Sequence, residues 1–79
     1  NAVLPGIVEG SRIDNVIRAR AAETGVSFKD MTDEYMKKVS LRRMVSPDDV
    51  ASSVGYLLSE FGKNISGQSL AVDGNVETL

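Results

Sequence analysis

The sequence contains neither cysteine nor histidine among its 79 residues. Without cysteine the chain has no disulfide framework and no thiolate site, which suits a reducing compartment, and we expect a cytoplasmic protein. Without histidine it lacks the usual ligands of a zinc site and the commonest general acid–base group. We therefore predict no metal site in this chain.

A strong charge of either sign and a long apolar run are also missing. The formal net charge of −2 gives no electrostatic reason to expect nucleic acid or an anionic membrane as a partner. No apolar run approaches the roughly 20 residues that a membrane-spanning helix needs. The length allows one small domain at most. From its charge and the missing apolar run, we predict that the chain binds neither nucleic acid nor a membrane.

The chain begins inside an apolar run and without a methionine. Residues 2–4 (AVL) predict the end of a buried strand, and Pro5-Gly6 predicts a turn. Because chain ends usually fall in exposed polar segments, we interpret the chain as a piece of a longer protein. A processed or shortened N-terminus is the alternative.

The best-specified element is a helix over residues 46–61 (SPDDVASSVGYLLSEF). Ser46 occupies an N-cap position, Pro47 suits the first helical position, and Asp49 can reach back to complete a capping box. Gly62 is the expected stop. The apolar residues of this helix recur with a 3.6-residue period and form one stripe: Val50, Ala51, Val54, Leu57, Leu58 and Phe61.

A shorter helix is predicted after the first strand. Ser11 with Asp14 predicts a capping box at its start, and Gly25 predicts its end. Its charged residues are interpreted as a solvated face: Arg12, Arg18, Arg20 and Glu23.

Another short helix is predicted to start at Ser27, with Asp30 in the capping position, or alternatively at Thr32. The basic residues at and after its end, which acidic neighbours balance, are interpreted as a solvated face or the rim of an interface: Lys37, Lys38, Arg42 and Arg43.

Residues 68–73 (QSLAVD) alternate between polar and apolar positions and predict a last strand, followed by a turn and a tail over residues 76–79. A strand, an amphipathic helix and another strand most simply form a crossover with parallel strands. The predicted class is therefore α/β. Because parallel sheets are covered on both faces, further strands and helices must come from additional sequence or other chains.

Three stretches of the chain resemble the short-chain dehydrogenase/reductase family. Residues 1–8 (NAVLPGIV) are similar to the end of the family's sixth strand and its proline-glycine turn. Residues 42–51 (RRMVSPDDVA) resemble the start of the helix before the last strand, and residues 64–75 (NISGQSLAVDGN) resemble that strand. The resemblance implies the C-terminal part of a doubly wound Rossmann-type fold, with the last two parallel strands, their crossover helix and a helical lid.

The resemblance divides the single partial domain of residues 1–79 into three parts. Residues 1–10 would form a strand end and a nicotinamide-side loop, residues 11–45 a substrate-side lid, and residues 46–79 the long helix and final strand. The implied function is that of a fragment of an oxidoreductase. The parent protein would transfer hydride between the nicotinamide of NAD or NADP and an alcohol or carbonyl substrate.

The resemblance also implies which residues lie beside the cofactor: Pro5, Gly6, Ile7, Val8 and Gly10. The backbone amide of Val8 is the strongest single candidate, because the family presents backbone groups there to the nicotinamide carboxamide. A glycine such as Gly6 also lets a ligand approach the backbone closely. Many members carry threonine at the position of Gly10, so a side-chain contact is not expected there.

The family's glycine-rich phosphate loop, catalytic serine, supporting asparagine and Tyr-x-x-x-Lys pair have no counterpart in the chain, and we assign no catalytic residue. Tyr35 and Lys38 stand three residues apart rather than four. The apolar lid residues are expected to pack rather than to touch substrate: Ile13, Ile17, Met31, Tyr35 and Met36. We expect no turnover by this chain alone.

Family members commonly form tetramers through the long helix and the final strand. The resemblance thus implies a homotetramer or another homo-oligomer that uses residues 46–61 and 68–73, in addition to contacts with the N-terminal part of the same subunit. A non-catalytic oligomerisation fragment is the alternative function. A stand-alone helical binding module is a third, which would leave the Pro5-Gly6 turn and the final strand unexplained.

Overall fold

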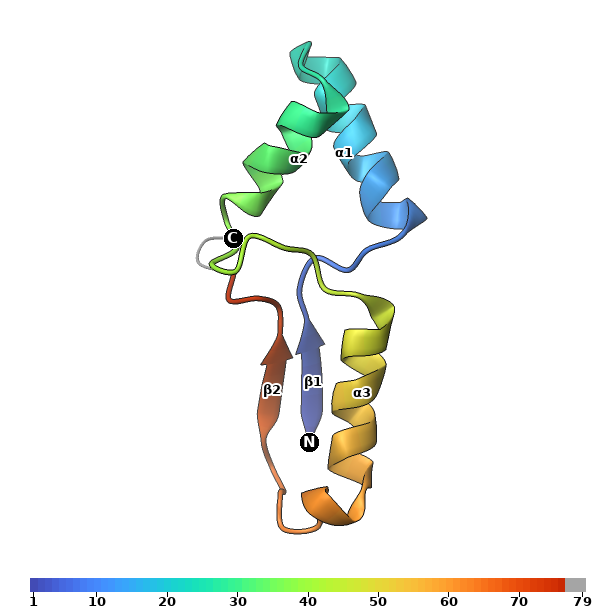
Figure 1. The fold of residues 1–79 in the computed structure, drawn as a ribbon, viewed down its shortest axis with the longest axis vertical. Helices are drawn as coiled ribbons and strands as arrows, with labels where there is room; N and C mark the ends of the chain where they lie inside the picture. Colours follow the sequence, from blue (N-terminus) through green and yellow to red (C-terminus); the bar gives the residue numbers. More distant parts are fainter. Residues whose placement is uncertain (77–79) are drawn as a thin grey trace.

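The structure is a computed structural model that describes residues 1–76. Its elements follow the order β1 (Ala2–Pro5), α1 (Ser11–Thr24), α2 (Phe28–Met36), α3 (Pro47–Leu58), the 3₁₀-helix η1 (Glu60–Gly62) and β2 (Ser69–Val72). The molecule is elongated, 50 × 23 × 16 Å. One half contains β1, β2 and α3, and the other half is the α1–α2 hairpin (Figure 1). The predicted α/β class is confirmed.

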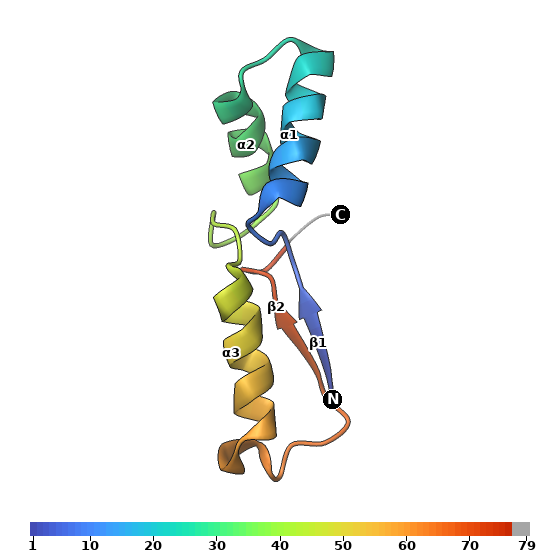
Figure 2. The same cartoon turned by 90° about the vertical axis from the view of Figure 1, so that its right-hand side faces the viewer.

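The two strands pair in parallel, as predicted, with Ala2 opposite Ser69 and Pro5 opposite Val72. Helix α3 lies against one face of this pair (Figures 1 and 2). Residues of α3 line the same surface hollows as Leu70 and Val72 of β2. Leu70 and Val72 therefore belong to the face of the sheet that is directed toward the helix. Leu4 lies on the other face and is 52% exposed. Among residues 1–76 no element covers that second face.

The predicted capping box of α3 is confirmed. The Asp49 backbone N–H donates to the Ser46 hydroxyl over 3.0 Å, and the Ser46 N–H donates to the Asp49 carboxylate over 2.9 Å. Pro47 begins the helix, where no backbone N–H is needed. These contacts also lower the pKa of the Asp49 carboxyl, chiefly because the Ser46 N–H binds its ionised form.

The predicted end of α3 at Phe61 is wrong. The helix ends at Leu58, because the Ser59 hydroxyl donates to the Tyr56 carbonyl over 2.7 Å and accepts the Phe61 N–H over 3.2 Å. The chain then turns into η1. Two residues of the predicted apolar stripe consequently project into solvent, Leu58 with 82% and Phe61 with 81% of its surface exposed.

The predicted capping box of α1 at Ser11 is wrong as well. Gly10 is the N-cap, Ser11 is the first helical residue, and no side chain caps the helix. The chain stays extended as far as Glu9, whose N–H donates to the Val45 carbonyl over 2.8 Å. The turn therefore occurs at Gly10, whose φ of 149° favours glycine. The predicted end at Gly25 is confirmed by its left-handed conformation.

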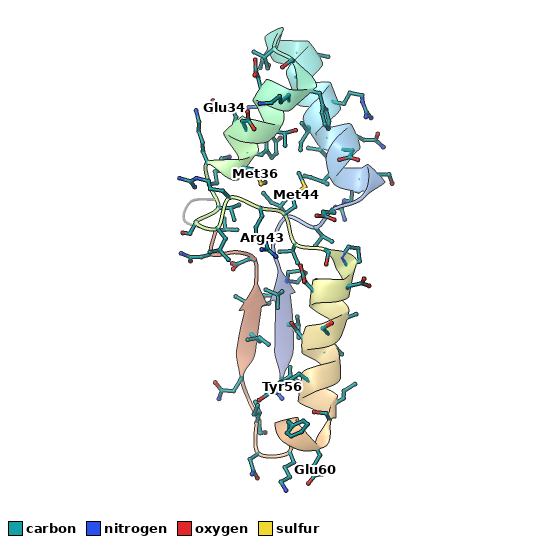
Figure 3. The ribbon with its side chains drawn as sticks, in the orientation of Figure 1. Glu34, Met36, Arg43, Met44, Tyr56 and Glu60 are labelled. Carbon is teal, nitrogen blue, oxygen red and sulfur yellow. The ribbon has the colours of Figure 1, made fainter. Side chains whose placement is uncertain are left out.

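Helix α2 starts as predicted. The Asp30 N–H donates to the Ser27 hydroxyl over 3.0 Å. The hairpin encloses a small core of Ile17, Ala21 and Met31, against which Ile13, Tyr35 and Met44 pack. Figure 3 shows Met44 at the base of the hairpin, so the connector after α2 closes this core from below. Tyr35 is a packing residue, as predicted.

The connector over residues 37–45 ties the two halves of the molecule together. The Val45 N–H donates to the Ile7 carbonyl over 2.8 Å, which joins the connector to the segment after β1. The Ser40 N–H donates to the Asn75 carbonyl over 2.8 Å, which joins it to the turn after β2. Val39 is only 1% exposed and pairs antiparallel with Val76. The rest of the predicted tail, residues 77–79, lies outside the described residues.

Arg42 is exposed, as predicted, and it also caps the end of α2. Its guanidinium donates to the carbonyls of Met36, Lys37 and Val39 over 3.3, 2.8 and 2.6 Å. These carbonyls lie at the end of α2, where helical partners run out. Arg42 adopts a φ of 55° to reach them.

No helix within residues 1–76 has the length and apolar character needed to cross a lipid bilayer.

Candidate functional site

The predicted cofactor-side residues gather at the carboxyl end of β1. Four of them line an open pocket of about 470 Å³ beside the start of α1. Gly10 is not among the lining residues and instead caps α1. The pocket is formed by the strand end and the first turns of α1: Pro5, Gly6, Ile7, Val8, Arg12, Ile13 and Val16.

The α1 side of this pocket was only partly anticipated from the sequence. Ile13 was predicted as a packing residue of the lid, whereas Arg12 was assigned to the solvated face. Arg12, Ile13 and Val16 all lie within the first two turns of α1, at spacings that share one face of a helix. The spacing was available in the sequence, but the contact with the loop after β1 depends on where the chain turns at Gly10.

Gly6 also has a structural reason, in addition to the close ligand approach that the sequence predicts. A Cβ atom at Gly6 would lie 2.6 Å from the Asp73 Cβ and 2.7 Å from the Asp73 Cα. The Gly6 N–H also donates to the Val72 carbonyl over 3.0 Å. The missing side chain therefore lets the end of β2 approach β1 closely, and this approach fixes the course of the pocket wall that follows.

Val8 lines the pocket, and its backbone N–H takes no part in the pairing with Val45. Val45 directs its N–H to the Ile7 carbonyl and its carbonyl to the Glu9 N–H, both over 2.8 Å. In a parallel bridge of this kind, the groups of the intervening residue face the opposite side. Within residues 1–76 the Val8 N–H has no acceptor. Free amides beyond the carboxyl ends of parallel strands are where α/β sheets bind ligands.

The pocket is apolar with a single charge. Among residues 1–76, Arg12 is the only ionisable residue in its lining, and no carboxylate, lysine or tyrosine of that range lines it. The groups with shifted pKa values lie elsewhere. The pKa of Lys29 is raised by its hydrogen bond to Asp33, and that of Lys37 by its hydrogen bond to Glu34. Within residues 1–76 the lining offers apolar surface and one guanidinium for contact with a ligand, and no acid–base group for proton transfer.

Tyr35 and Lys38 contact each other on the hairpin. The Lys38 ammonium lies 5.8 Å from the centre of the Tyr35 ring, in a cation–π contact on the hairpin. Tyr35 does not line the pocket beside β1.

Comparison with known proteins identifies the family. The family model described as enoyl-(acyl carrier protein) reductase matches residues 1–76. The crystal structure of a short chain dehydrogenase family protein from Francisella tularensis superimposes with a TM-score of 0.82 at 32% identity, covering 91% of this chain and 30% of that one. The chain belongs to the short-chain dehydrogenase/reductase family. Its two parallel strands and three helices match part of that family's Rossmann fold.

Several curated proteins are similar to this chain in sequence. A diacetyl reductase [(S)-acetoin forming] of Staphylococcus aureus is 30% identical over 76 residues, which are 96% of this chain and 30% of that protein. An L-2,3-butanediol dehydrogenase of Corynebacterium glutamicum is 32% identical over 76 residues, which are 96% of this chain and 30% of that protein. An enoyl-[acyl-carrier-protein] reductase [NADH] of Haemophilus influenzae is 35% identical over 69 residues, 82% of this chain and 26% of that protein. The chain thus spans about 30% of the length of these relatives.

Proposed function

We propose that the chain is the C-terminal portion of an NAD(P)-dependent oxidoreductase that transfers hydride between nicotinamide and an alcohol or carbonyl carbon, in the cytoplasm. Membership of the family supports the reaction class. The observation that carries the role of this chain is the free Val8 N–H beside the pocket at the end of β1.

The residues of the pocket fit a nicotinamide ring with its carboxamide. Pro5, Ile7 and Val8 offer apolar side chains on which a flat ring can rest, and the Val8 N–H offers a donor to an amide oxygen. The cofactor, once bound, would supply or accept the hydride. The chain's own part is to hold the carboxamide at Val8 and to keep water from the ring with the side chains of Ile7 and Ile13. Gly10 contributes conformation only.

Removal of the Val8 N–H tests this role. In the full-length subunit, Val8→Pro deletes the donor at a residue whose N–H takes no part in strand pairing. We expect the KM for NADH or NADPH to rise about tenfold, the effect of one lost hydrogen bond. The measurement is the initial rate of cofactor absorbance loss with a panel of ketones and aldehydes.

Val8→Ala is the matched control, because it shortens the side chain and keeps the N–H. It should leave the cofactor KM within about twofold, and both variants should unfold at the same denaturant concentration as the parent. An unchanged cofactor KM in a folded Val8→Pro protein would contradict the assignment. The 79-residue chain alone should show no turnover in this assay, since the family's catalytic tyrosine and lysine have no counterpart in it.

We also propose that the subunit associates with a second copy of itself through α3, η1 and β2. The supporting observation is the apolar pair Leu58 and Phe61, each more than four-fifths exposed at the end of the helix. Large apolar side chains gathered at one exposed site are typical of association surfaces. The non-catalytic alternative, an oligomerisation fragment, uses the same surface.

Light scattering on the full-length protein distinguishes these proposals. Leu58→Ser together with Phe61→Ser should halve the mass of the assembly, or reduce it further. Leu41→Ser removes another exposed apolar side chain, from the connector, and should leave the mass unchanged. A parent protein that is already monomeric would exclude the association surface, and a folded oligomer without cofactor binding would favour the non-catalytic alternative.

A further inference from the structure

The lysine and arginine side chains of the protein differ in the contacts that they make. Lys29, Lys37 and Lys63 form ion pairs on the surface. Three others are engaged in direct contacts. Arg42 caps α2, Lys38 lies over Tyr35, and Arg18 lies 5.3 Å from the centre of the Phe28 ring. Arg43 makes no such contact within residues 1–76, but its charge adds to the Ser46 contacts that lower the pKa of Asp49.

Arg12 and Arg20 remain, both exposed on α1. Neither guanidinium has a hydrogen-bond or ion-pair partner within residues 1–76. The two arginines differ in their position on the helix. Arg12 lies in the first turn and lines the pocket at the end of β1, whereas Arg20 lies two turns further along, beside α2.

The charge around Arg12 is unusual for this protein. The chain is acidic as a whole, with 11 carboxylates against 9 cations. The nearest carboxylates in sequence, Glu9 and Asp14, neither line the pocket nor approach Arg12 within ion-pair distance. Within the described part of the chain, a single guanidinium thus lies at the edge of an apolar pocket without a carboxylate partner. Its planar fork of donors suits a carboxylate or phosphate better than it suits a neutral group.

We propose that Arg12 is a specificity residue that binds an anionic group of the substrate, a carboxylate or a phosphate, at the pocket beside Val8. This inference rests on the proposed function, because it takes the ring-binding side of the pocket from there. The uncharged remainder of the substrate lies between Arg12 and the apolar residues Ile13 and Val16. The protein then prefers oxo acids to the corresponding neutral esters.

The test uses the full-length protein with acetoacetate and ethyl acetoacetate, which differ in charge and share the reacting ketone. The full-length protein without substitutions should have a higher kcat/KM with the acid than with the ester. Arg12→Met should raise the KM for the acid about 10- to 100-fold, as expected for a lost charge-assisted hydrogen bond, and change kcat/KM for the ester less than about twofold. Arg12→Lys, which keeps the charge and loses the fork, should fall between the two.

Arg20→Met is the matched control on the same helix and should leave both substrates unaffected. Equal kcat/KM for acid and ester in the parent, or an equal loss with both in Arg12→Met, would overturn the proposal. A rise in the cofactor KM alone would also overturn it, because the anion would then be a phosphate of the dinucleotide. Failure of the full-length protein to bind NADH or NADPH would instead remove the proposed function, and this inference with it.

Discussion

Gly6→Ala tests the close approach of the two strands that shapes the pocket wall. The new Cβ would lie 2.6 Å from the Asp73 Cβ and 2.7 Å from its Cα, where carbon atoms normally stand near 3.5–4 Å apart. Because the obstacle includes backbone, it cannot rotate away as a long side chain could. We expect a loss of about 2–3 kcal/mol in the free energy of unfolding, the upper part of the range for overpacked sites.

Urea unfolding of the full-length protein measures this loss. Gly55→Ala is the matched control, because a Cβ at Gly55 in α3 meets no atom within 4 Å. Alanine there should stabilise the helix by about 0.5–1 kcal/mol, since glycine is the poorer helix former. The reasoning would be refuted if Gly6→Ala changed the free energy of unfolding by less than about 0.5 kcal/mol, or if the two variants shifted it by the same amount and sign.

Two further predictions concern the cap of α3. Ser46→Ala should lower the free energy of unfolding by about 1 kcal/mol in urea titrations, whereas Ser52→Ala in the exposed helix body should not lower it. The lowered pKa of Asp49 means that its contribution is present above the ordinary aspartate value, about 3.9, and is lost as pH falls through the lower folded pKa. In Asp49→Asn the free energy of unfolding should therefore fall less steeply as the pH is lowered into the acid range. An unchanged acid dependence would argue against this cap.

Local signals in the sequence predicted the elements that local contacts decide. Ser27 and Ser46 each bind the backbone N–H three residues later, and Gly25 ends α1 in a left-handed conformation. These contacts lie within one helical turn, so the residue types alone were sufficient. The parallel pairing followed from the order of strand, helix and strand, which leaves few ways to bury the helix.

Long-range contacts explain the errors. Ser11 carries a good capping side chain, but the bond between Glu9 and Val45 keeps the chain extended and moves the turn to Gly10. Arg42 is exposed as predicted, but its capping role was not predicted because it depends on where α2 ends. For the candidate site, the sequence predicted Pro5, Gly6, Ile7 and Val8 through resemblance. It could not predict Arg12, because the pocket depends on how the first turns of α1 lie beside the loop after β1.

The α1–α2 hairpin contacts no other helix or strand within residues 1–76 and is held only through its two connections. Such a unit can be exchanged between related proteins, because few side-chain contacts with the rest of the molecule would have to form anew. A chimera would join at Gly10 and within the connector, keeping Val45 for the bond to the loop and Met44 for the hairpin core. Evolution of a new specificity could follow the same route, with the hairpin replaced and the strand ends kept.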